Sequence, residues 1–317
     1  MSTLRQDVED YLATRRAMGF KVEGLSKLLR NFVSFCEARG ALRVQDEIVL
    51  QWASTPIKVP VSDALFARRM DAVRVFARFQ HALDPHTQVP PERVRRQRYQ
   101  PKEPNVFDEA QVVALLRAAD TLTPRFRAAT WRTLIGLLAA TGMRPGEACR
   151  LVLDDLDLAT GLVRVVDTKF GKSRLVFLHP STVTMMSHYL TVRADRVPST
   201  AQACPALFVN SRGGALNPDR LGVTFKQIVA AAGAPTRPGH RPPRLYDLRH
   251  TFAVTTMLTW YRQGRDVQEA MPLLTTWLGH ANPASTYWYL HAVPELLAHA
   301  TDRLESRADA ATTEPTS

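Results

Sequence analysis

One stretch of this chain, residues 84–104, limits most strongly what the rest can fold into. It reads DPHTQVPPERVRRQRYQPKEP and holds five prolines without an apolar period. Proline lacks an amide hydrogen and fixes its φ angle, so the stretch cannot form the interior of a helix or sheet. We therefore predict a linker between two domains, 1–83 and 105–306, with a disordered tail over 307–317.

Two apolar stripes before the linker recur at intervals of three and four residues, as on one face of a helix. They consist of Leu4, Val8, Tyr11 and Leu12, and of Leu25, Leu28, Leu29, Phe32 and Phe35. Ser62 precedes a further apolar period and is a typical N-cap residue. We predict an all-helical first domain.

The stretch after the linker combines helical periods with one β-rich pair. LVRVVDT (162–168) and SRLVFLH (173–179) are rich in β-branched residues and are separated by KFGK, which predicts a hairpin with a glycine turn. Helices are predicted over 107–120, 127–140, 217–233, 247–263 and 272–278. The predicted fold class is therefore mainly α with a small β-hairpin or sheet (α+β).

The charge balance favours a polyanionic partner. Lys and Arg number 41 against 30 Asp and Glu, which gives a net charge of +11 and a pI near 10.0. Nucleic acid is the first candidate, and the alternative is a basic surface that is merely solvated. Within the linker, Arg95, Arg96 and Arg98 are candidates for contacts along a phosphate backbone. A soluble hinge is the alternative there.

Other features exclude several classes of protein. Cys36, Cys149 and Cys204 are widely spaced and form no CxxC or Cys/His cluster, so we predict neither a disulfide framework nor a zinc site. No uninterrupted apolar run has the length of a signal peptide or a membrane span. We expect a cytoplasmic protein without a membrane partner.

Two short motifs place basic side chains at turns. In TGMRPGEA, Arg144 lies in a Gly/Pro turn before a new helix, where an arginine is costly unless it binds an anion or a carboxylate. The alternative to an anion is a pair with Glu147 that braces the turn. In DTKFGKSR, Lys169 and Lys172 lie at the hairpin tip, where they either reach a phosphate or are simply solvated.

A third motif gathers polar groups at the start of a helix. In RLYDLRHTFA, Tyr246, Arg249 and His250 lie near a helix N-terminus, which is a favourable place for an anion. Arg241 and Arg244 add positive charge just upstream and are further candidates for DNA contacts. A surface Arg-His pair is the alternative.

The order and spacing of these motifs are more specific than any one of them. In LGHANPASTYWY, His280 follows a glycine that ends a helix, and Tyr289 lies nine residues on. With the earlier Arg, the hairpin Lys about 25 residues later and the Arg-His pair, residues 105–305 resemble the tyrosine recombinases, the phage integrase family. The segment STYWYL-x-A-x-P-E-L resembles integrases of mobile elements. The first domain resembles the family's core-binding (SAM-like) domain, which clamps DNA.

The resemblance implies a role for each matching residue. Arg144 and Arg249 would brace the scissile phosphate, and His280 would hydrogen-bond it. Lys169 would protonate the leaving 5′ oxygen. Tyr289 would be the nucleophile and would form a 3′-phosphotyrosine. The family's reaction needs no metal ion and no other cofactor.

One position departs from the family's pattern. Three residues before the second arginine, where the family usually has His or Lys, this chain has Tyr246. A tyrosine donates one hydrogen bond but does not shuttle protons near pH 7 as an imidazole does. His250 or His240 could take over acid-base duty. Tyr287 and Trp288 are interpreted as packing that orients the nucleophile.

The resemblance also implies partners. The substrate is double-stranded DNA, and the active form is a tetramer on two duplexes. The amphipathic segment 294–306 would dock on a neighbouring protomer or, alternatively, pack on its own domain. We expect integration or excision of a mobile element in a bacterial, nucleoid-associated setting, while dimer resolution and the need for accessory proteins that set the direction stay open. Two alternatives stay open: a topoisomerase-like enzyme that relaxes DNA, and a catalytically inactive DNA-binding repressor or accessory protein.

Overall fold

The computed structural model consists of two compact units, Met1–Gln100 and Pro101–Ser317. The residues that the structure describes are 3–56, 60–92, 94, 104–166, 173–196, 204–234, 241–280, 282–292 and 296. The predicted tail, 307–317, lies outside them.

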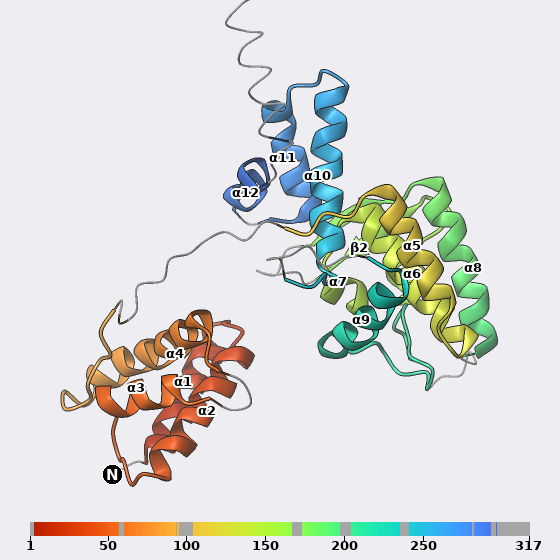
Figure 1. Cartoon of the computed structure of the whole chain (residues 1–317). Coiled ribbons are helices and arrows are strands. Elements are labelled where there is room, and N and C mark those ends of the chain that lie inside the picture. Colours follow the sequence, from red (N-terminus) through yellow and green to blue (C-terminus); the bar gives the residue numbers. More distant parts are fainter. Residues whose placement is uncertain are drawn as a thin grey trace, which may run out of the picture. The chain divides into compact units, whose positions relative to one another are not determined.

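Helices build the first unit (Figure 1). Its described helices are α1 (Leu4–Ala17), α2 (Glu23–Glu37), α3 (Asp46–Ser54) and α4 (Asp63–His81). The predicted cap is confirmed, since the Ser62 side chain accepts a hydrogen bond from the Leu65 amide at 3.2 Å. The apolar faces of the helices close one core around Phe32, Trp52 and Phe76.

The buried face of α1 is the predicted one, and that of α2 is rotated. All four predicted residues of α1 are buried. In α2 the buried residues are Ser26, Leu29, Phe32, Val33 and Cys36, while Leu25, Leu28 and Phe35 pack at the edge of the core. Ser26 tolerates burial because its hydroxyl donates to the Glu23 carbonyl at 3.0 Å. A stripe that counts only large apolar residues therefore misses the centre of this face.

Two arginines of α4 hold the fold together. Arg69 donates from Nη1 to the Thr55 carbonyl at 2.7 Å, just beyond the end of α3. Arg74 donates from Nε to the Pro90 carbonyl at 3.0 Å and from Nη2 to the Pro91 carbonyl at 2.8 Å. Carbonyls at helix ends and in proline segments need donors from elsewhere in the chain. These two side chains thus fix the end of α3 and the first part of the proline-rich stretch on this unit.

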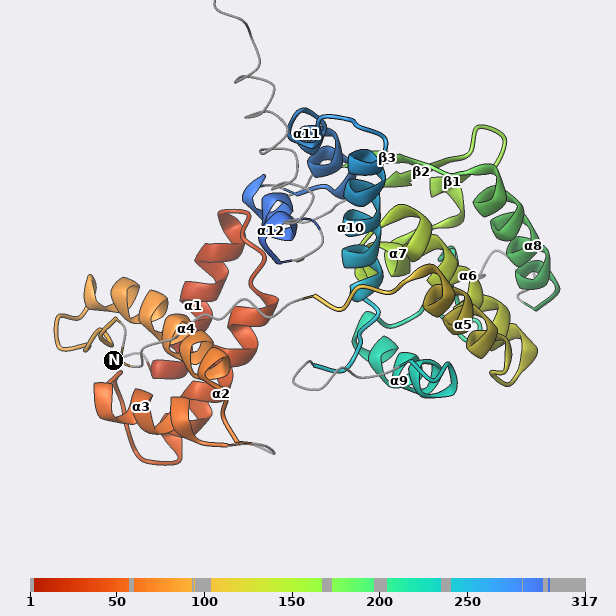
Figure 2. The same ribbon diagram turned by 45° about the horizontal axis from the view of Figure 1, so that its top comes forward.

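The second unit combines helices with one small sheet (Figure 2). Its described elements are α5 (Glu109–Asp120), α6 (Arg125–Thr141), α7 (Pro145–Arg150), η1 (Leu153–Asp155), β1 (Leu156–Asp157), β2 (Leu162–Val165), β3 (Arg174–Phe177), α8 (Pro180–Arg196), η2 (Pro218–Arg220), α9 (Leu221–Ala231), α10 (Asp247–Arg262), α11 (Val267–Leu278) and α12 (Ala284–Ala292). The strands pair antiparallel in the order β1-β2-β3, with Leu162 opposite Phe177 and Val165 opposite Arg174. The predicted pairing of two strands and the predicted fold class are confirmed.

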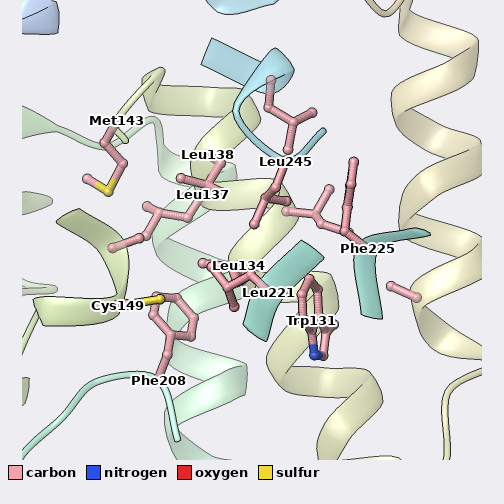
Figure 3. Close-up of a cluster of buried hydrophobic side chains, with 14 of the residues drawn as sticks. Trp131, Leu134, Leu137, Leu138, Met143, Cys149, Phe208, Leu221, Phe225 and Leu245 are labelled. Atoms are coloured by element: carbon pink, nitrogen blue, oxygen red, sulfur yellow. The ribbon is translucent and has the colours of Figure 1, made fainter. Parts of the chain in front are cut away.

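Helix α6 forms the centre of the second unit. Its sequence is apolar on nearly every side, which is typical of a helix surrounded by others. Figure 3 shows Trp131, Leu134, Leu137 and Leu138 of α6 among side chains from α9 and from the segment before α10. Gly142 ends α6 in the left-handed conformation, with a φ angle of +64°, which glycine adopts without a steric cost. The carbonyl groups at this helix end face the candidate site.

Helix α11 begins earlier than predicted. Asp266 caps it by accepting hydrogen bonds from the amides of Gln268 (2.8 Å) and Glu269 (3.4 Å). Pro272, the predicted first residue, therefore lies inside the helix. An internal proline leaves the carbonyl four residues before it without a donor. That carbonyl belongs to Gln268, which is exposed to water, so the proline is tolerated.

Four described elements of the second unit are not predicted by the sequence pattern. They are η1, β1, which pairs with β2, and the helices α8 and α12. The aromatic segment near the C-terminus thus belongs to a helix, α12, that packs against α10 and α11. Within the described residues, no helix is both long and apolar enough to cross a membrane.

Candidate active site

Arg249 is buried where two helices end. It lies in α10, and its side chain is fully buried. Nη1 donates to the Gly142 carbonyl at 2.8 Å, and Nη2 donates to the Leu278 carbonyl at 2.7 Å. These carbonyls close α6 and α11, and the C-terminal end of a helix carries partial negative charge that stabilises a cation. The guanidinium is therefore fixed in place before any ligand binds.

Arg144 lies beside the same turn and remains accessible. Its backbone amide and its Nη1 donate to the two carboxylate oxygens of Glu147, at 3.0 and 2.6 Å. Its Nη2 donates to the Gly279 carbonyl at 3.2 Å. Gly279 follows Leu278 directly, so Arg144 and Arg249 bind neighbouring carbonyls at the end of α11. The Arg144 side chain is 23% exposed, which leaves it open to a ligand.

Glu147 joins Arg144 to a third arginine, Arg174, which the motifs do not reveal. Arg174 begins β3 and donates from Nη2 to the buried Glu147 carboxylate at 2.8 Å. Burial opposes the charge on Glu147, but the hydrogen bonds and charges of the two arginines outweigh it and lower its pKa to about 2. Arg174 lies 27 residues from Glu147 in the sequence, so no local sequence signal connects the two.

The turn that ends α11 positions His280. Gly279 has a φ angle of +66°, and a Cβ atom there would lie 2.9 Å from Nη1 of Arg174. His280 follows, and its Nδ1 lies 2.7 Å from the hydroxyl of Thr286. Burial, and then the charges of the neighbouring arginines, lower the pKa of His280 to about 3. The imidazole is therefore neutral near pH 7.

Tyr289 is enclosed, whereas Tyr287 is not. Two residues on a helix are about 200° apart, so these side chains face opposite sides of α12. Tyr289 is 2% exposed and Tyr287 is 38% exposed. The Tyr289 hydroxyl lies 2.9 Å from Nδ1 of His250, and its ring packs on Trp288 and on His250. Trp288 and His250, and not Tyr287, thus orient the Tyr289 ring.

Tyr246 lies at the edge of this group. It precedes α10 directly and is 38% exposed. Its ring stands edge-on to His250, with the ring centroids 5.1 Å apart. The Tyr246 side chain is thus partly accessible to solvent, whereas that of Tyr289 is buried.

Positive charge is in excess at the turn. Within the described residues, Glu147 is the carboxylate that directly pairs there, against Arg144, Arg174 and Arg249. Burial, and next the charge of Arg144, lower the pKa of Arg249 to about 10. Burial raises the pKa of Tyr289 well above its usual value, while Arg249 opposes that change. An anion bound at this turn would relieve the repulsion between the arginines.

The amino-acid sequence matches a known protein family, and the geometry of the site agrees with that match. Residues 105–295 match the model of the phage integrase family. The chain belongs to that family. It is 37% identical to the putative integrase/recombinase y4rB of Sinorhizobium fredii, over 97% of this chain and 98% of that protein. It is 30% identical to the tyrosine recombinase XerC of a Mycobacterium species, over 88% of this chain and 90% of that protein. The protein is a tyrosine-type site-specific recombinase.

Solved structures of integrases and recombinases share the fold. The Tn1549 transposon integrase in complex with transposon right-end DNA is 16% identical, with a TM-score of 0.66 over 96% of this chain and all of that one (100%). The XerH recombinase bound to its difH substrate is 22% identical, with a TM-score of 0.60 over 95% and 84%. A lambda integrase tetramer bound to a Holliday junction is 16% identical, with a TM-score of 0.59 over 91% and 77%.

The structure brings most of the predicted phosphate-binding residues of this integrase-family chain to one turn. Arg144, Arg249 and His280 lie around Gly279, and the charges of both arginines act on the Tyr289 phenol. The hairpin lysines Lys169 and Lys172, the linker arginines Arg95, Arg96 and Arg98, and His240 lie outside the described residues.

Two predicted DNA contacts of this recombinase differ in their surroundings. Arg241 donates from Nη1 and Nη2 to the carboxylate of Asp247, at 2.9 and 2.5 Å. Asp247 is fully buried and also accepts from the Arg244 amide at 2.7 Å. Arg241 therefore fixes the start of α10, and its guanidinium is engaged within the chain. The Arg244 side chain is exposed.

Proposed function

We propose that this recombinase cleaves and rejoins double-stranded DNA through a covalent bond between Tyr289 and the 3′ phosphate at the break. The observation that carries the proposal is the meeting of Arg144, Arg249 and His280 at one helix-end turn. Their excess positive charge suits a phosphodiester. Tyr289 supplies a hydroxyl on which the charges of both arginines act.

The proposed reaction is an in-line displacement at phosphorus. The Tyr289 oxygen forms a bond to phosphorus, and the bond from phosphorus to the 5′ oxygen breaks. The products are a 3′-phosphotyrosine and a 5′ hydroxyl. Negative charge builds on the pentacoordinate phosphate, and the Arg249 guanidinium, already fixed by two helix-end carbonyls, stabilises it without reorganising.

His280 is held to donate a hydrogen bond to that phosphate. The Thr286 hydroxyl accepts from the Thr275 hydroxyl at 3.0 Å, so its own proton is free to go to Nδ1 of His280, 2.7 Å away. This places the ring proton of the neutral imidazole on Nε2. Nε2 is then the donor available to the substrate phosphate.

The family resemblance supplies the leaving-group acid. Lys169 would give a proton to the 5′ oxygen as the bond to phosphorus breaks. The phosphotyrosine ester keeps the energy of the broken bond, so attack by a 5′ hydroxyl of another strand rejoins the DNA. Strand exchange then needs neither ATP nor a metal ion.

We assign the reaction to a mobile element and to a tetrameric assembly. The name of the relative y4rB, an integrase/recombinase, and the fold of the Tn1549 transposon integrase support the first assignment. The lambda integrase of the same fold is a tetramer on a Holliday junction, which supports the second. The segment 294–306 would join neighbouring protomers, and accessory proteins would set the direction of recombination.

Covalent trapping tests the proposal. The DNA is the element's own end, or a selected binding site, with a nick just beyond the scissile phosphate so that the cleaved fragment diffuses away. Wild type and Tyr287→Phe should give a protein-DNA adduct on a denaturing gel without added divalent metal, and Tyr289→Phe should not. Tyr287→Phe is the matched control because Tyr287 faces away from the site. An adduct that survives Tyr289→Phe, or bound DNA without any adduct, would overturn the proposal.

A further inference from the structure

The attacking phenol needs a partner for its proton. A phenol with a pKa near 10 is a weak nucleophile until its proton is removed. Tyr246 occupies the position where the family usually has His or Lys, and it is 38% exposed. A second phenol is no better a base than the first. Another group has to take up the proton of Tyr289.

His250 is already in contact with the reacting oxygen. It follows Arg249 directly in α10, so its side chain points about 100° away from that of Arg249 around the helix. This direction leads to α12, where Nδ1 of His250 lies 2.9 Å from the Tyr289 hydroxyl. The rings of Tyr246, Trp288 and Tyr289 enclose the imidazole, with centroids 5.1 to 5.7 Å away.

The charges around His250 select the ring tautomer that can accept a proton at Nδ1. Nε2 lies 3.9 Å from Oδ1 of Asp247, and the Asp247 carboxylate accepts two hydrogen bonds from Arg241. A proton on Nε2 faces this negative charge, whereas a lone pair there would be repelled by it. Nδ1 therefore carries the lone pair, and the Tyr289 hydroxyl donates to it.

We propose that His250 holds the Tyr289 hydroxyl by this hydrogen bond and takes up its proton as the phenol attacks DNA. The inference rests on the proposed function. In the step, the O–H bond of Tyr289 breaks and its proton binds Nδ1 of His250. The freed electron pair forms the bond to phosphorus, and the leaving 5′ oxygen takes a proton from Lys169. On rejoining, His250 returns the proton to the phenol.

The surroundings of His250 suit a base that is neutral at rest. Burial, and the charges of Arg241 and Arg249 against that of Asp247, lower its pKa to about 4. The rings of Tyr246 and Tyr289 face it, and its charge is among the causes that lower the pKa of His280. The imidazolium that forms during attack is stabilised by Asp247 and by the negative charge that builds on the phosphate.

Two substitutions separate proton transfer from positioning. The side-chain oxygen of asparagine lies where Nδ1 of histidine does, so His250→Asn keeps an acceptor for the Tyr289 hydroxyl but removes the base. His250→Leu removes both. General-base catalysis typically contributes ~10²–10⁴-fold, and we expect the rate of adduct formation to fall by that factor in His250→Asn and by at least as much in His250→Leu.

The pH profile and the acidity of the nucleophile give readouts that a purely structural role would not move. Wild type should cleave at a nearly constant rate from about pH 6 to about pH 8, whereas the rate of His250→Asn should rise with pH as hydroxide replaces the base. Placing 3,5-difluorotyrosine, a more acidic phenol, at position 289 should speed His250→Asn by a larger factor than wild type. Equal factors, or a His250→Asn rate within about threefold of wild type, would overturn the inference.

Failure of the inference differs from failure of the proposed function. Wild type that forms no adduct contradicts the proposed function, whereas an adduct that forms independently of His250 contradicts only this inference. The tautomer is measurable in the full chain even if the His250 variants do not fold. ¹⁵N NMR should show protonated Nε2 and unprotonated Nδ1 in wild type, with the Nδ1 signal shifted in Tyr289→Phe. A proton on Nδ1 would overturn the inference.

Discussion

Arg174 and Glu147 form a buried ion pair, with Nη2 and Oε2 2.8 Å apart. The two side chains are 10% and 2% exposed. Water cannot solvate either charge if its partner is removed, and breaking such a pair is typically far more costly than breaking a surface pair. The pair joins β3 to the first turn of α7, where Arg144 begins the candidate phosphate site.

We expect Arg174→Met to lower the free energy of unfolding by roughly 3 kcal/mol. The rate of adduct formation should fall as well, because Glu147 would no longer be held in the place where it positions Arg144. Urea denaturation and single-turnover trapping measure the two effects. The matched control is Arg132→Met, which breaks an exposed pair with Asp120 and should cost less than about 1 kcal/mol. Equal losses in the two variants would contradict a buried structural pair.

Gly279 should be less replaceable than another glycine of the same conformation. Both Gly279 (φ +66°) and Gly264 (φ +71°) are left-handed, but a Cβ at Gly279 would meet Arg174 Nη1 at 2.9 Å, whereas one at Gly264 would meet nothing within 4 Å. Gly264→Ala should cost about 1 kcal/mol of stability from the backbone alone. Gly279→Ala should cost more and should also slow cleavage, since Arg144 and His280 depend on this turn. Urea denaturation measures the stability of both variants, and covalent trapping measures their cleavage rates. Equal losses in the two variants would contradict the clash with Arg174.

Arg249→Lys should damage catalysis more than DNA binding. Lysine keeps the charge but cannot reach both the Gly142 and Leu278 carbonyls and a phosphate with one compact ammonium. We expect adduct formation to slow by ~10²–10³-fold, with DNA affinity in a mobility-shift assay changed little. Arg117→Lys, at an exposed site at the end of α5, is the control and should change neither. An unchanged cleavage rate in Arg249→Lys would remove this side chain from the mechanism.

Local signals in the sequence predict much of this fold. The Ser62 cap and the two strands of the hairpin follow from neighbouring residues, and so does the bond between Arg144 and Glu147, three residues apart. Such features depend on turn and helix geometry that a short window determines. Pro272 shows where local rules mislead, since the exposed Gln268 and the Asp266 cap allow the helix to run through it.

The remaining contacts depend on tertiary packing. Arg249 reaches Gly142 from 107 residues away, and Arg174 reaches Glu147 from 27 residues away. No spacing rule connects such residues, because folding alone brings α6, α11 and β3 together at one turn. The family resemblance indicates Arg144 and Arg249 as a pair, but it does not reveal that Arg174 shares their carboxylate. The contact between His250 and Tyr289, 39 residues apart, likewise appears only in the structure.

The buried His250 should make the protein less stable in mild acid. Its folded-state pKa is about 4, against an ordinary value of 6.5. Between these values the unfolded chain binds more protons, so unfolding becomes easier as the pH falls. The stabilisation is complete above about pH 6.5 and is lost progressively toward about pH 4. At about pH 5 we expect His250 alone to account for a loss of roughly 2 kcal/mol relative to pH 7.

Urea denaturation of wild type and His250→Asn at about pH 7 and about pH 5 isolates this contribution. Glu147, whose pKa is lowered to about 2, loses its stabilising effect only as the pH falls below its ordinary value of 4.5, so it does not contribute in this window. His280 contributes in the same direction in both proteins, because burial and the charges of Arg249, Arg144 and Arg174, which precede His250 among the causes of its lowered pKa, are the same in both. The free energy of unfolding of wild type should therefore fall more between the two pH values than that of His250→Asn. The difference is the contribution of His250 itself. If both proteins lost the same amount, His250 would be titrating in the folded state as it does in the unfolded chain, and its enclosure by α10 and α12 would be wrong.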